Sequence, residues 1–224
     1  MSYDIYLALE AAGTKDLFNS PAHTDRMGLL TEPLNLAQNP DNLPVGVAKA
    51  SVTVGQYKGT YAGLTCAACH TGQIQYQGKQ IRIEGGATSR LALWDWLRSL
   101  SASLDSVSTD PEKYKGLTER IRAKGPVDEA DLRKRLIADT ALLRERVDTI
   151  LLMPFDSGPG RMDALGLIHN AFTGGATGTL QNMRLAAAPV KPPFLWNAPQ
   201  SAWIQWSGIS DNPLTRNFSE TLGV

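Results

Sequence analysis

Apolar side chains recur at helical spacing in several segments of the chain. The clearest segment is 128–153, where Asp128 is suited to cap the N-terminus of a helix. Its apolar stripe consists of Leu132, Leu136, Leu143, Val147, Ile150 and Leu151. Basic residues between 133 and 146 fall mostly outside this stripe, which is typical of a solvated helix face. Further helices are predicted over 2–12, 89–104 and 161–172, and from Asp110 towards Arg122.

Alternation of polar and apolar positions predicts strands in two places. Segments 73–76 and 80–83 alternate on either side of Gln77-Gly78-Lys79, which is typical of a β-hairpin. A briefer alternation over 51–57 predicts one more strand. Turn residues are too dense over 19–46 for long helices, and the glycine-rich segment 174–178 is predicted to be a loop.

The composition is that of a globular protein. Of 224 residues, 42% are hydrophobic and 20% are charged, and the formal net charge is zero. This balance disfavours a nucleic-acid or anionic-membrane surface. No stretch has the apolar length of a membrane span, and the N-terminus lacks the features of a signal peptide.

The two cysteines both lie in Cys66-Ala67-Ala68-Cys69-His70. Cys-x-x-Cys-His is the attachment signature of c-type haem, in which the cysteines form thioethers with the haem vinyl groups. The histidine that follows them is the proximal ligand of the iron. The motif therefore predicts one covalent haem c, with Cys66, Cys69 and His70 binding it and His70 as the metal ligand.

Two other kinds of site share part of this pattern. A thioredoxin-like dithiol also uses Cys-x-x-Cys, but between a strand and a long helix, whereas here Gly63-Leu64-Thr65 precedes the motif and a hairpin pattern follows it. A zinc site needs a second pair of ligands, and the remaining histidines, His23 and His169, are far apart. Both readings are weaker than haem.

Three segments together resemble the bacterial di-haem cytochrome c peroxidase superfamily. They are 65–72 around the haem motif, 160–166 (Gly-Arg-Met-Asp-Ala-Leu-Gly), and 192–199 (Pro-Pro-Phe-Leu-Trp-Asn-Ala-Pro) followed by Trp206-Ser207-Gly208. Their order and the ending Arg-Asn-Phe-Ser-Glu-Thr-Leu-Gly (216–223) look most like the branch of the di-haem rubber oxygenases. The resemblance covers most of the chain from Asp25 onwards.

This resemblance implies a mainly α, cytochrome-c-like haem domain with long irregular loops and a small β-hairpin after the motif. Members react with peroxide or dioxygen, reside in the periplasm or are secreted, and receive electrons from a small cytochrome or cupredoxin. The family has two haem motifs and this chain has one. We therefore expect residues 1–224 to form a single haem domain, which is either the N-terminal part of a longer protein with a second haem domain or a mono-haem relative.

The sixth ligand of the iron decides between an enzyme and a carrier. A methionine there gives a pure electron-transfer cytochrome with no substrate of its own, whereas an open position binds peroxide or dioxygen. His23 is expected to be an exposed loop residue. The remaining candidates are Met27, Met153, Met162, Met183, His169 or no protein ligand at all.

Two further residues are candidates for roles around the haem. Arg161 precedes a predicted helix, where its guanidinium is suited either to a haem propionate or to pairing with Asp156 or Asp163. The resemblance implies that Trp196 transfers electrons between haems. Calcium is a candidate second cofactor.

Overall fold

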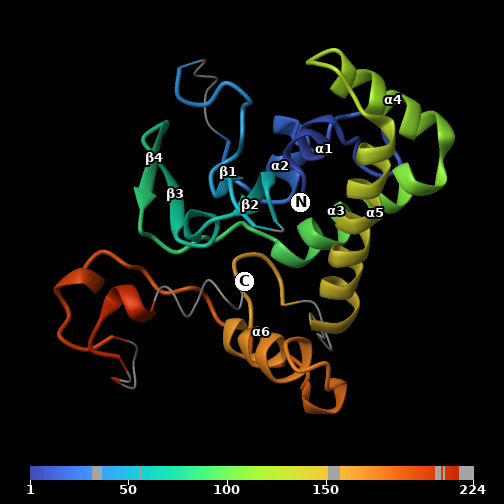
Figure 1. The fold of residues 1–224 in the computed structure, drawn as a ribbon. Helices are drawn as coiled ribbons and strands as arrows, with labels where there is room; N and C mark the ends of the chain where they lie inside the picture. The colour runs from blue at the N-terminus through green and yellow to red at the C-terminus, as the bar shows by residue number, and fades with distance from the viewer. Residues whose placement is uncertain (32–36, 56, 151–156, 205–207, 209, 217–224) are drawn as a thin grey trace. The chain divides into compact units, whose positions relative to one another are not determined.

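The computed structural model describes residues 1–31, 37–55, 57–150, 157–204, 208 and 210–216 (Figure 1). The chain divides into two compact units. Unit 1 comprises Met1–Ala68 and Arg90–Val147, and unit 2 comprises Cys69–Ser89 and Asp148–Val224. The boundary between Ala68 and Cys69 falls inside the Cys-x-x-Cys-His motif.

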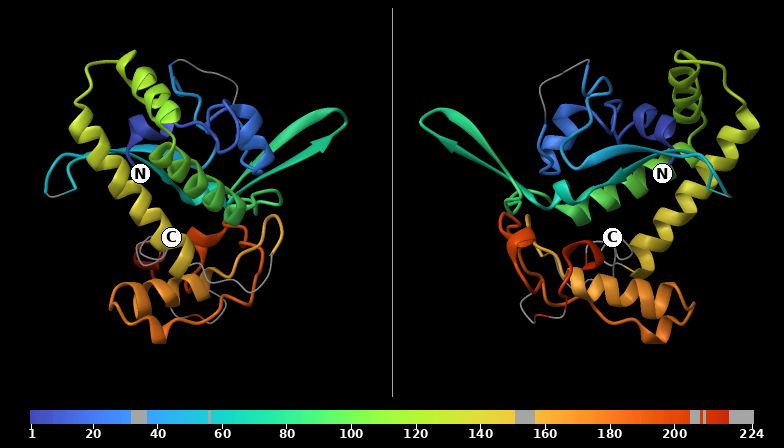
Figure 2. Two further views of the ribbon diagram at one scale, coloured as in Figure 1. Left: turned by 90° about the vertical axis from the view of Figure 1, so that its right-hand side faces the viewer. Right: turned by 60° about the vertical axis from the view of Figure 1, so that its left-hand side comes forward.

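Several helices lie in unit 1. They are α1 (Tyr3–Ala8), α2 (Pro21–Arg26), α3 (Leu93–Thr109), α4 (Pro111–Arg122) and α5 (Glu129–Glu145), and a π-helical turn, η2 (Arg146–Ile150), continues α5. α3 packs against α4 and α5, as Figure 2 shows. Leu104, Leu117 and Leu132, one from each of these helices, are fully buried. Burial of each leucine stabilises the fold by roughly 2 kcal/mol.

The predicted starts of α4 and α5 are confirmed. The Asp110 carboxylate accepts the backbone N–H of Glu112 at 2.9 Å, and that of Asp128 accepts the N–H of Ala130 at 2.9 Å. Each aspartate thereby satisfies an N–H that has no partner within its helix.

Two other predicted helices have different bounds. α1 ends at Ala8 rather than residue 12, because the chain turns back so that Glu10 bridges Leu17. α3 begins at Leu93 rather than residue 89, since the preceding residues contact the end of α2. The Ala92 N–H donates to the Met27 carbonyl at 3.0 Å, and Gly28 lies directly against the Arg90 carbonyl.

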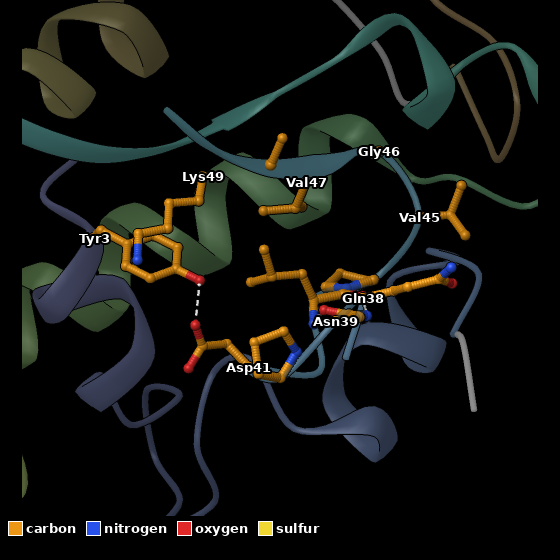
Figure 3. Close-up of a pocket in the computed structure, with 12 residues that line it drawn as sticks. Tyr3, Gln38, Asn39, Asp41, Val45, Gly46, Val47 and Lys49 are labelled. Carbon is orange, nitrogen blue, oxygen red and sulfur yellow. Dashed lines mark hydrogen bonds between the residues drawn. The ribbon is translucent and has the colours of Figure 1, made fainter. Parts of the chain in front are cut away.

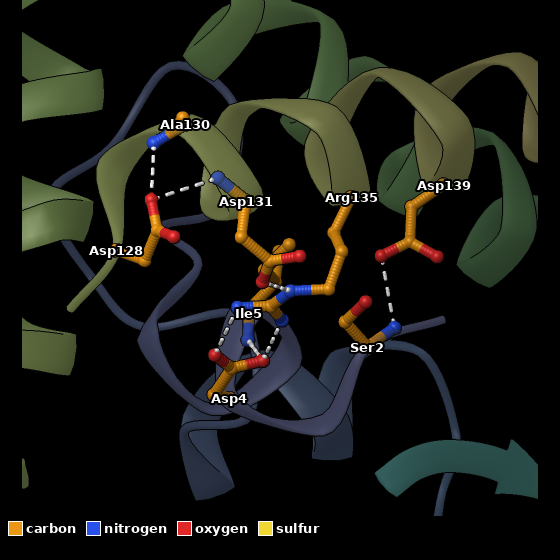
Figure 4. A network of polar contacts seen from close by, with 8 residues as sticks. All are labelled: Ser2, Asp4, Ile5, Asp128, Ala130, Asp131, Arg135 and Asp139. Carbon is orange, nitrogen blue, oxygen red and sulfur yellow. Dashed lines mark hydrogen bonds and ion pairs between the residues drawn. The ribbon is translucent and has the colours of Figure 1, made fainter. Parts of the chain in front are cut away.

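An ion-pair network joins α1 to α5 (Figure 4). Arg135 of α5 donates to both carboxylate oxygens of Asp4, at 2.6 and 2.9 Å, and to Asp131 at 2.7 Å. One turn further along, the buried Asp139 accepts the backbone N–H of Ser2 at 2.8 Å. The sequence predicts a solvated face for the basic run of α5, but Arg135 within it holds the N-terminal helix α1 through Asp4.

Strands form two separate antiparallel pairs. In unit 1, β1 (Val47–Val52) pairs with β2 (Gly59–Leu64), and β2 ends just before the cysteine motif. The strand predicted over 51–57 overlaps only the end of β1. In unit 2, β3 (Thr71–Tyr76) pairs with β4 (Lys79–Glu84), which confirms the predicted hairpin (Figure 2). Its two-residue turn has positive φ at Gln77 and Gly78, +48° and +75°, as a type I′ turn requires.

The remaining elements of unit 2 are short. They are α6 (Ala164–Asn170), the π-helical turn η3 (Ala171–Gly175) and the 3₁₀ turns η4 (Leu180–Asn182) and η5 (Ala198–Gln200). The helix predicted over 161–172 is therefore shorter at its start. The loop predicted over 174–178 begins inside η3, where Met183 covers the buried Gly174.

The expected fold class, a mainly α, cytochrome-c-like haem domain, is wrong. In the part of the chain that the structure describes, helices occur together with two small antiparallel sheets, so the protein is mixed α and β, and no haem-binding fold is evident there. The physical reason lies in β1 and β2. Both are largely exposed, so they carry little apolar alternation, and their pairing with each other defines them. No helix in the described part of the chain is long and apolar enough to span a membrane.

Candidate functional site

The cysteine motif connects β2 to β3 through one tight turn. Cys66, Ala67 and Ala68 form a 3₁₀ helix, η1 (Cys66–Ala68), and β3 begins at Thr71. Cys66 is exposed and Cys69 is half-buried. A thiol must be accessible to react with another molecule, and Cys66 satisfies this requirement.

His70 is oriented by the backbone of a distant segment in its own unit. Its Nδ1 atom lies 2.7 Å from the carbonyl oxygen of Pro193. A carbonyl oxygen only accepts, so Nδ1 is the donor of this bond, and Nε2 is the ring nitrogen left to ligate a metal. Metal-binding histidines characteristically donate their other ring N–H in this way, which fixes the tautomer and raises the basicity of the ligating nitrogen.

The segment that contains Pro193 is anchored to the end of the β3–β4 hairpin. The Leu195 N–H donates to the Gly85 carbonyl at 2.7 Å, and Trp196 Nε1 donates to the Glu84 carbonyl at 3.0 Å. Gly85 has φ +71°, and a Cβ there would lie 3.1 Å from the Trp196 ring. The absence of a side chain at Gly85 therefore lets Trp196 lie against the hairpin.

Trp196 remains accessible despite this anchoring. Its ring stacks on Phe194 with centroids 4.9 Å apart, and the two residues are 53% and 63% exposed. Trp196 is thus a surface aromatic three residues beyond the carbonyl that orients His70.

Gly160 brings the second segment of the resemblance close to the motif. It has φ +68°, and a Cβ there would lie 2.8 Å from the Thr88 carbonyl oxygen. Thr88 in turn donates its N–H to the Cys69 carbonyl at 2.9 Å. Unit 2 therefore brings residues of all three segments, 65–72, 160–166 and 192–199, close to the residues that precede or follow the hairpin. Sequence reasoning missed Gly85 and Thr88, for which the only signal is the Gly85-Gly86 pair after β4.

On the unit 1 side, the motif turn rests on Gly46. The Thr65 N–H donates to the Gly46 carbonyl at 2.8 Å. Gly46 has φ +91°, and a Cβ there would overlap Ala68, with its nearest atoms at 2.3 to 2.4 Å. Only glycine allows this contact, so Gly46 supports the turn that carries Cys66.

A cavity of about 490 Å³ lies on the other side of Gly46 (Figure 3). The Tyr3 hydroxyl donates to Asp41 at 2.7 Å, and the Lys49 ammonium lies 4.8 Å from the Tyr3 ring centre. Burial, reinforced by the hydrogen bond to Asp41, raises the pKa of Tyr3. Tyr3 therefore remains a hydrogen-bond donor at physiological pH.

Arg161 and Asp163 have different environments. Arg161 is exposed. Asp163 is buried, and its carboxylate accepts the N–H of Gly166 at 2.9 Å and that of Ala188 at 3.0 Å. Asp163 caps α6 and ties it to the following segment, so a pairing with Arg161 does not account for it. The other suggested partner, Asp156, lies outside the described residues.

The candidates for the sixth ligand are scattered over both units. Met27 is half-buried at the end of α2, and Met162 is half-buried where it bridges Val190. Met183 is buried against Gly174. His169 is exposed, with Nε2 3.2 Å from the Asn182 carbonyl. Met153 lies outside the described residues.

The expectation that His23 is an exposed loop residue is wrong. His23 lies in α2 and is 4% exposed, with its ring 4.6 Å from that of Phe18. Its Nε2 atom is 3.5 Å from the Ser99 hydroxyl of α3. Desolvation by burial, and then the charge of Arg26, lowers the pKa of His23.

Within the described ranges, no group of three or more His, Cys, Asp or Glu side chains is placed to hold a metal ion. The calcium prediction is untested by this observation, since carbonyl oxygens also bind calcium.

A comparison with known protein families finds no match, and no solved structure matches the chain. Among curated proteins, the chain is similar to "Uncharacterized protein y4iJ" of Sinorhizobium fredii (strain NBRC 101917 / NGR234), with 27% identity over 227 residues. The aligned region is 92% of this chain and 36% of that protein, so the chain spans only part of the relative's length. The functional argument therefore depends on the site itself.

Proposed function

We propose that this chain is a c-type haem oxidoreductase domain of the di-haem cytochrome c peroxidase type, closest to the rubber-oxygenase-like branch. Cys66 and Cys69 bind the haem through thioethers, and His70 is the proximal ligand of its iron. The observation that carries the proposal is the hydrogen bond from His70 Nδ1 to the Pro193 carbonyl, 2.7 Å long. It selects the tautomer in which Nε2 is the ligating atom.

The residues around the motif fit a covalent haem in three respects. The Cys66 side chain is exposed. The turn that carries Cys66 packs against Gly46 through Ala68, so the backbone at Cys66 has a defined position. His70 follows directly, with its ring oriented by a carbonyl. When bound, the haem would supply an iron that transfers electrons and, at an open position, binds peroxide or dioxygen.

The chain's own residues have distinct roles in this proposal. The Pro193 carbonyl holds the proton on His70 Nδ1 and so increases the electron density that Nε2 donates. Trp196, exposed and anchored to Glu84 and Gly85, is proposed to pass electrons. Arg161, exposed in the loop that reaches Thr88, is proposed to bind a propionate.

Covalent haem attachment normally follows export, so we propose a periplasmic or secreted location. The electron donor would be a small cytochrome or cupredoxin, and a second haem domain would be the partner in a longer protein. The runner-up function is a simple electron-transfer cytochrome without a substrate.

One observation favours a different class, a thiol–disulfide oxidoreductase. A strand, β2, does precede the Cys-x-x-Cys motif, which sequence reasoning did not predict. However, a hairpin rather than a long helix follows the motif, so the helix N-terminus that lowers the pKa of a thioredoxin cysteine is missing from its usual place.

Production of the chain in the periplasm with a haem-attachment system separates these classes. We expect mass spectrometry of the denatured wild-type protein to show one covalent haem, and Cys66→Ala/Cys69→Ala to lose it. Wild-type protein without covalent haem, but with a reversible Cys66–Cys69 disulfide, would support the dithiol class instead.

For a haem-loaded protein, visible spectra with added carbon monoxide and peroxide separate enzyme from carrier. Rapid binding of these ligands supports an open iron position. A methionine-to-iron charge-transfer band without ligand binding supports the carrier.

A further inference from the structure

Helix α5 has a second face, with two large aliphatic side chains, that no described residue of unit 1 covers. One side of the helix is buried, with Leu132 at 0% and Leu136 at 2% exposure. On another side, Ile137 and Leu142 are 62% and 63% exposed, although both are large aliphatic residues. A surface helix normally has one apolar stripe, so the second one is unexplained by the fold of the chain.

The two faces lie on opposite sides of the helix. Each residue advances by about 100°, so Lys134, Ala138, Ala141 and Glu145 follow one another along a single line. All four are exposed, and Ile137 and Leu142 flank this line. We call these six residues the outer face of α5.

The outer face is complementary to itself when a second copy runs in the opposite direction. Lys134 and Glu145 lie at equal distances on either side of the midpoint between Asp139 and Thr140. Ile137 and Leu142 do so too, as do Ala138 and Ala141. A twofold axis at this midpoint therefore places Lys134 opposite Glu145 and alanine opposite alanine along the centre of the face. It places the two copies of Ile137 beside each other on one flank and the two copies of Leu142 beside each other on the other flank.

We propose that the outer face of α5 is the interface of a homodimer, in which α5 pairs antiparallel with α5 of a second copy. The two central alanines permit the close approach of about 8–10 Å that packed helices adopt. The aliphatic pairs on either side supply the apolar contact. The Lys134–Glu145 pairs at both ends set the direction and register, because a parallel pairing would bring like charges together.

Charge complementarity is what identifies the occupant as another copy. The face carries a base at one end and an acid at the other, so a partner needs the same two charges in reverse order. A second copy provides them by symmetry. A single helix pair falls below the roughly 1,000 Å² of a stable interface, so association in the micromolar to millimolar range is expected. This proposal does not depend on the haem.

Sedimentation equilibrium of the full chain tests the interface. We expect the apparent mass to rise with concentration from 24.3 kDa towards twice that value. Ile137→Lys and Leu142→Lys should each raise the dimer Kd by at least ~10-fold. Leu165→Lys is the matched control, because Leu165 is a helical leucine in α6 with a similar exposed fraction, 62%, and should leave the Kd unchanged.

A charge swap tests the register. Lys134→Glu places two acids opposite each other, and Glu145→Lys two bases, so each should weaken the dimer. The double variant Lys134→Glu/Glu145→Lys restores opposite charges and should recover wild-type association. Circular dichroism confirms that each variant is folded.

Three outcomes would overturn the proposal. The first is a protein that stays monomeric up to about 1 mM, the Kd of a weak encounter. The second is a dimer whose Kd is unchanged by Ile137→Lys. The third is a double charge swap whose dimer Kd is no lower than that of either single variant. A monomer whose outer face is covered by another domain of a longer chain falls under the first outcome.

Discussion

The Nδ1 atom of His70 lies 2.7 Å from the carbonyl oxygen of Pro193, a residue 123 positions further along the chain. This bond determines which nitrogen of the ring is left to bind a metal, and the backbone of another segment makes it. The orientation of His70 is therefore a property of unit 2 as a folded body.

Pro193→Gly is expected to raise the reduction potential of the haem that we propose at His70. Loss of the ring loosens the backbone at residue 193, which weakens the hydrogen bond and lowers the basicity of the His70 ligand. A less basic ligand stabilises ferric iron less. Redox titration measures the shift, with Pro192→Gly as the control, since it loosens the chain one residue earlier. Equal shifts in the two variants would contradict the role of the Pro193 carbonyl.

Gly46→Ala is expected to destabilise unit 1 by about 2 kcal/mol or more. The new Cβ would occupy a left-handed conformation and overlap Ala68 at 2.3 Å. Gly13→Ala is the matched control, because Gly13 also has positive φ but no atom within 4 Å of its added Cβ. The control should lose only about 1 kcal/mol. Urea denaturation measures both, and an equal loss would show that the overlap with Ala68 is harmless.

Arg135→Gln is expected to lower the free energy of unfolding by about 1 kcal/mol. The change removes two hydrogen bonds to Asp4 and the pairing with Asp131, but these side chains are partly exposed and screened by solvent. The loss should shrink in high salt. Lys115→Gln, an exposed change on α4, should have no measurable effect in the same urea titration. A loss independent of salt would point to packing instead of charge.

The stability of unit 1 is expected to fall as the pH drops below about 6.5, the ordinary pKa of an imidazole. Burial lowers the pKa of His23 in the folded state, so the unfolded chain takes up a proton first. The contribution of His23 to stability is therefore fully present above the pKa that His23 has in the unfolded chain. It is lost as the pH falls towards the lowered pKa of the folded state, by at most ~1.4 kcal/mol per pH unit. Urea unfolding of wild-type and His23→Gln protein between about pH 5 and 8 tests this. His23→Gln should flatten the dependence, and an unchanged slope would assign it to other groups.

Local signals in the sequence were sufficient for several elements. Asp110 and Asp128 have short side chains that satisfy helix N–H groups directly, so both helix starts were predicted correctly. The β3–β4 hairpin followed from alternation around Gln77-Gly78, whose turn needs no distant contact. The prediction for His23 was wrong for the opposite reason. Its neighbours Ser20 and Pro21 suggest a loop, but burial against Phe18 and near Ser99 comes from tertiary packing.

The motif Cys66-Ala67-Ala68-Cys69-His70 is readable from the sequence because it consists of adjacent residues. The hydrogen bond that orients His70 is visible only in the folded chain, since its acceptor is the carbonyl of Pro193. The tertiary structure also decided that Gly46 and Gly85 are needed as glycines, at Ala68 and Trp196 respectively. The mixed α and β fold was likewise decided by the pairing of exposed strands, which carry almost no apolar pattern of their own. Contacts between distant residues leave no periodic trace in a single sequence, and for that reason these features became visible only in the folded chain.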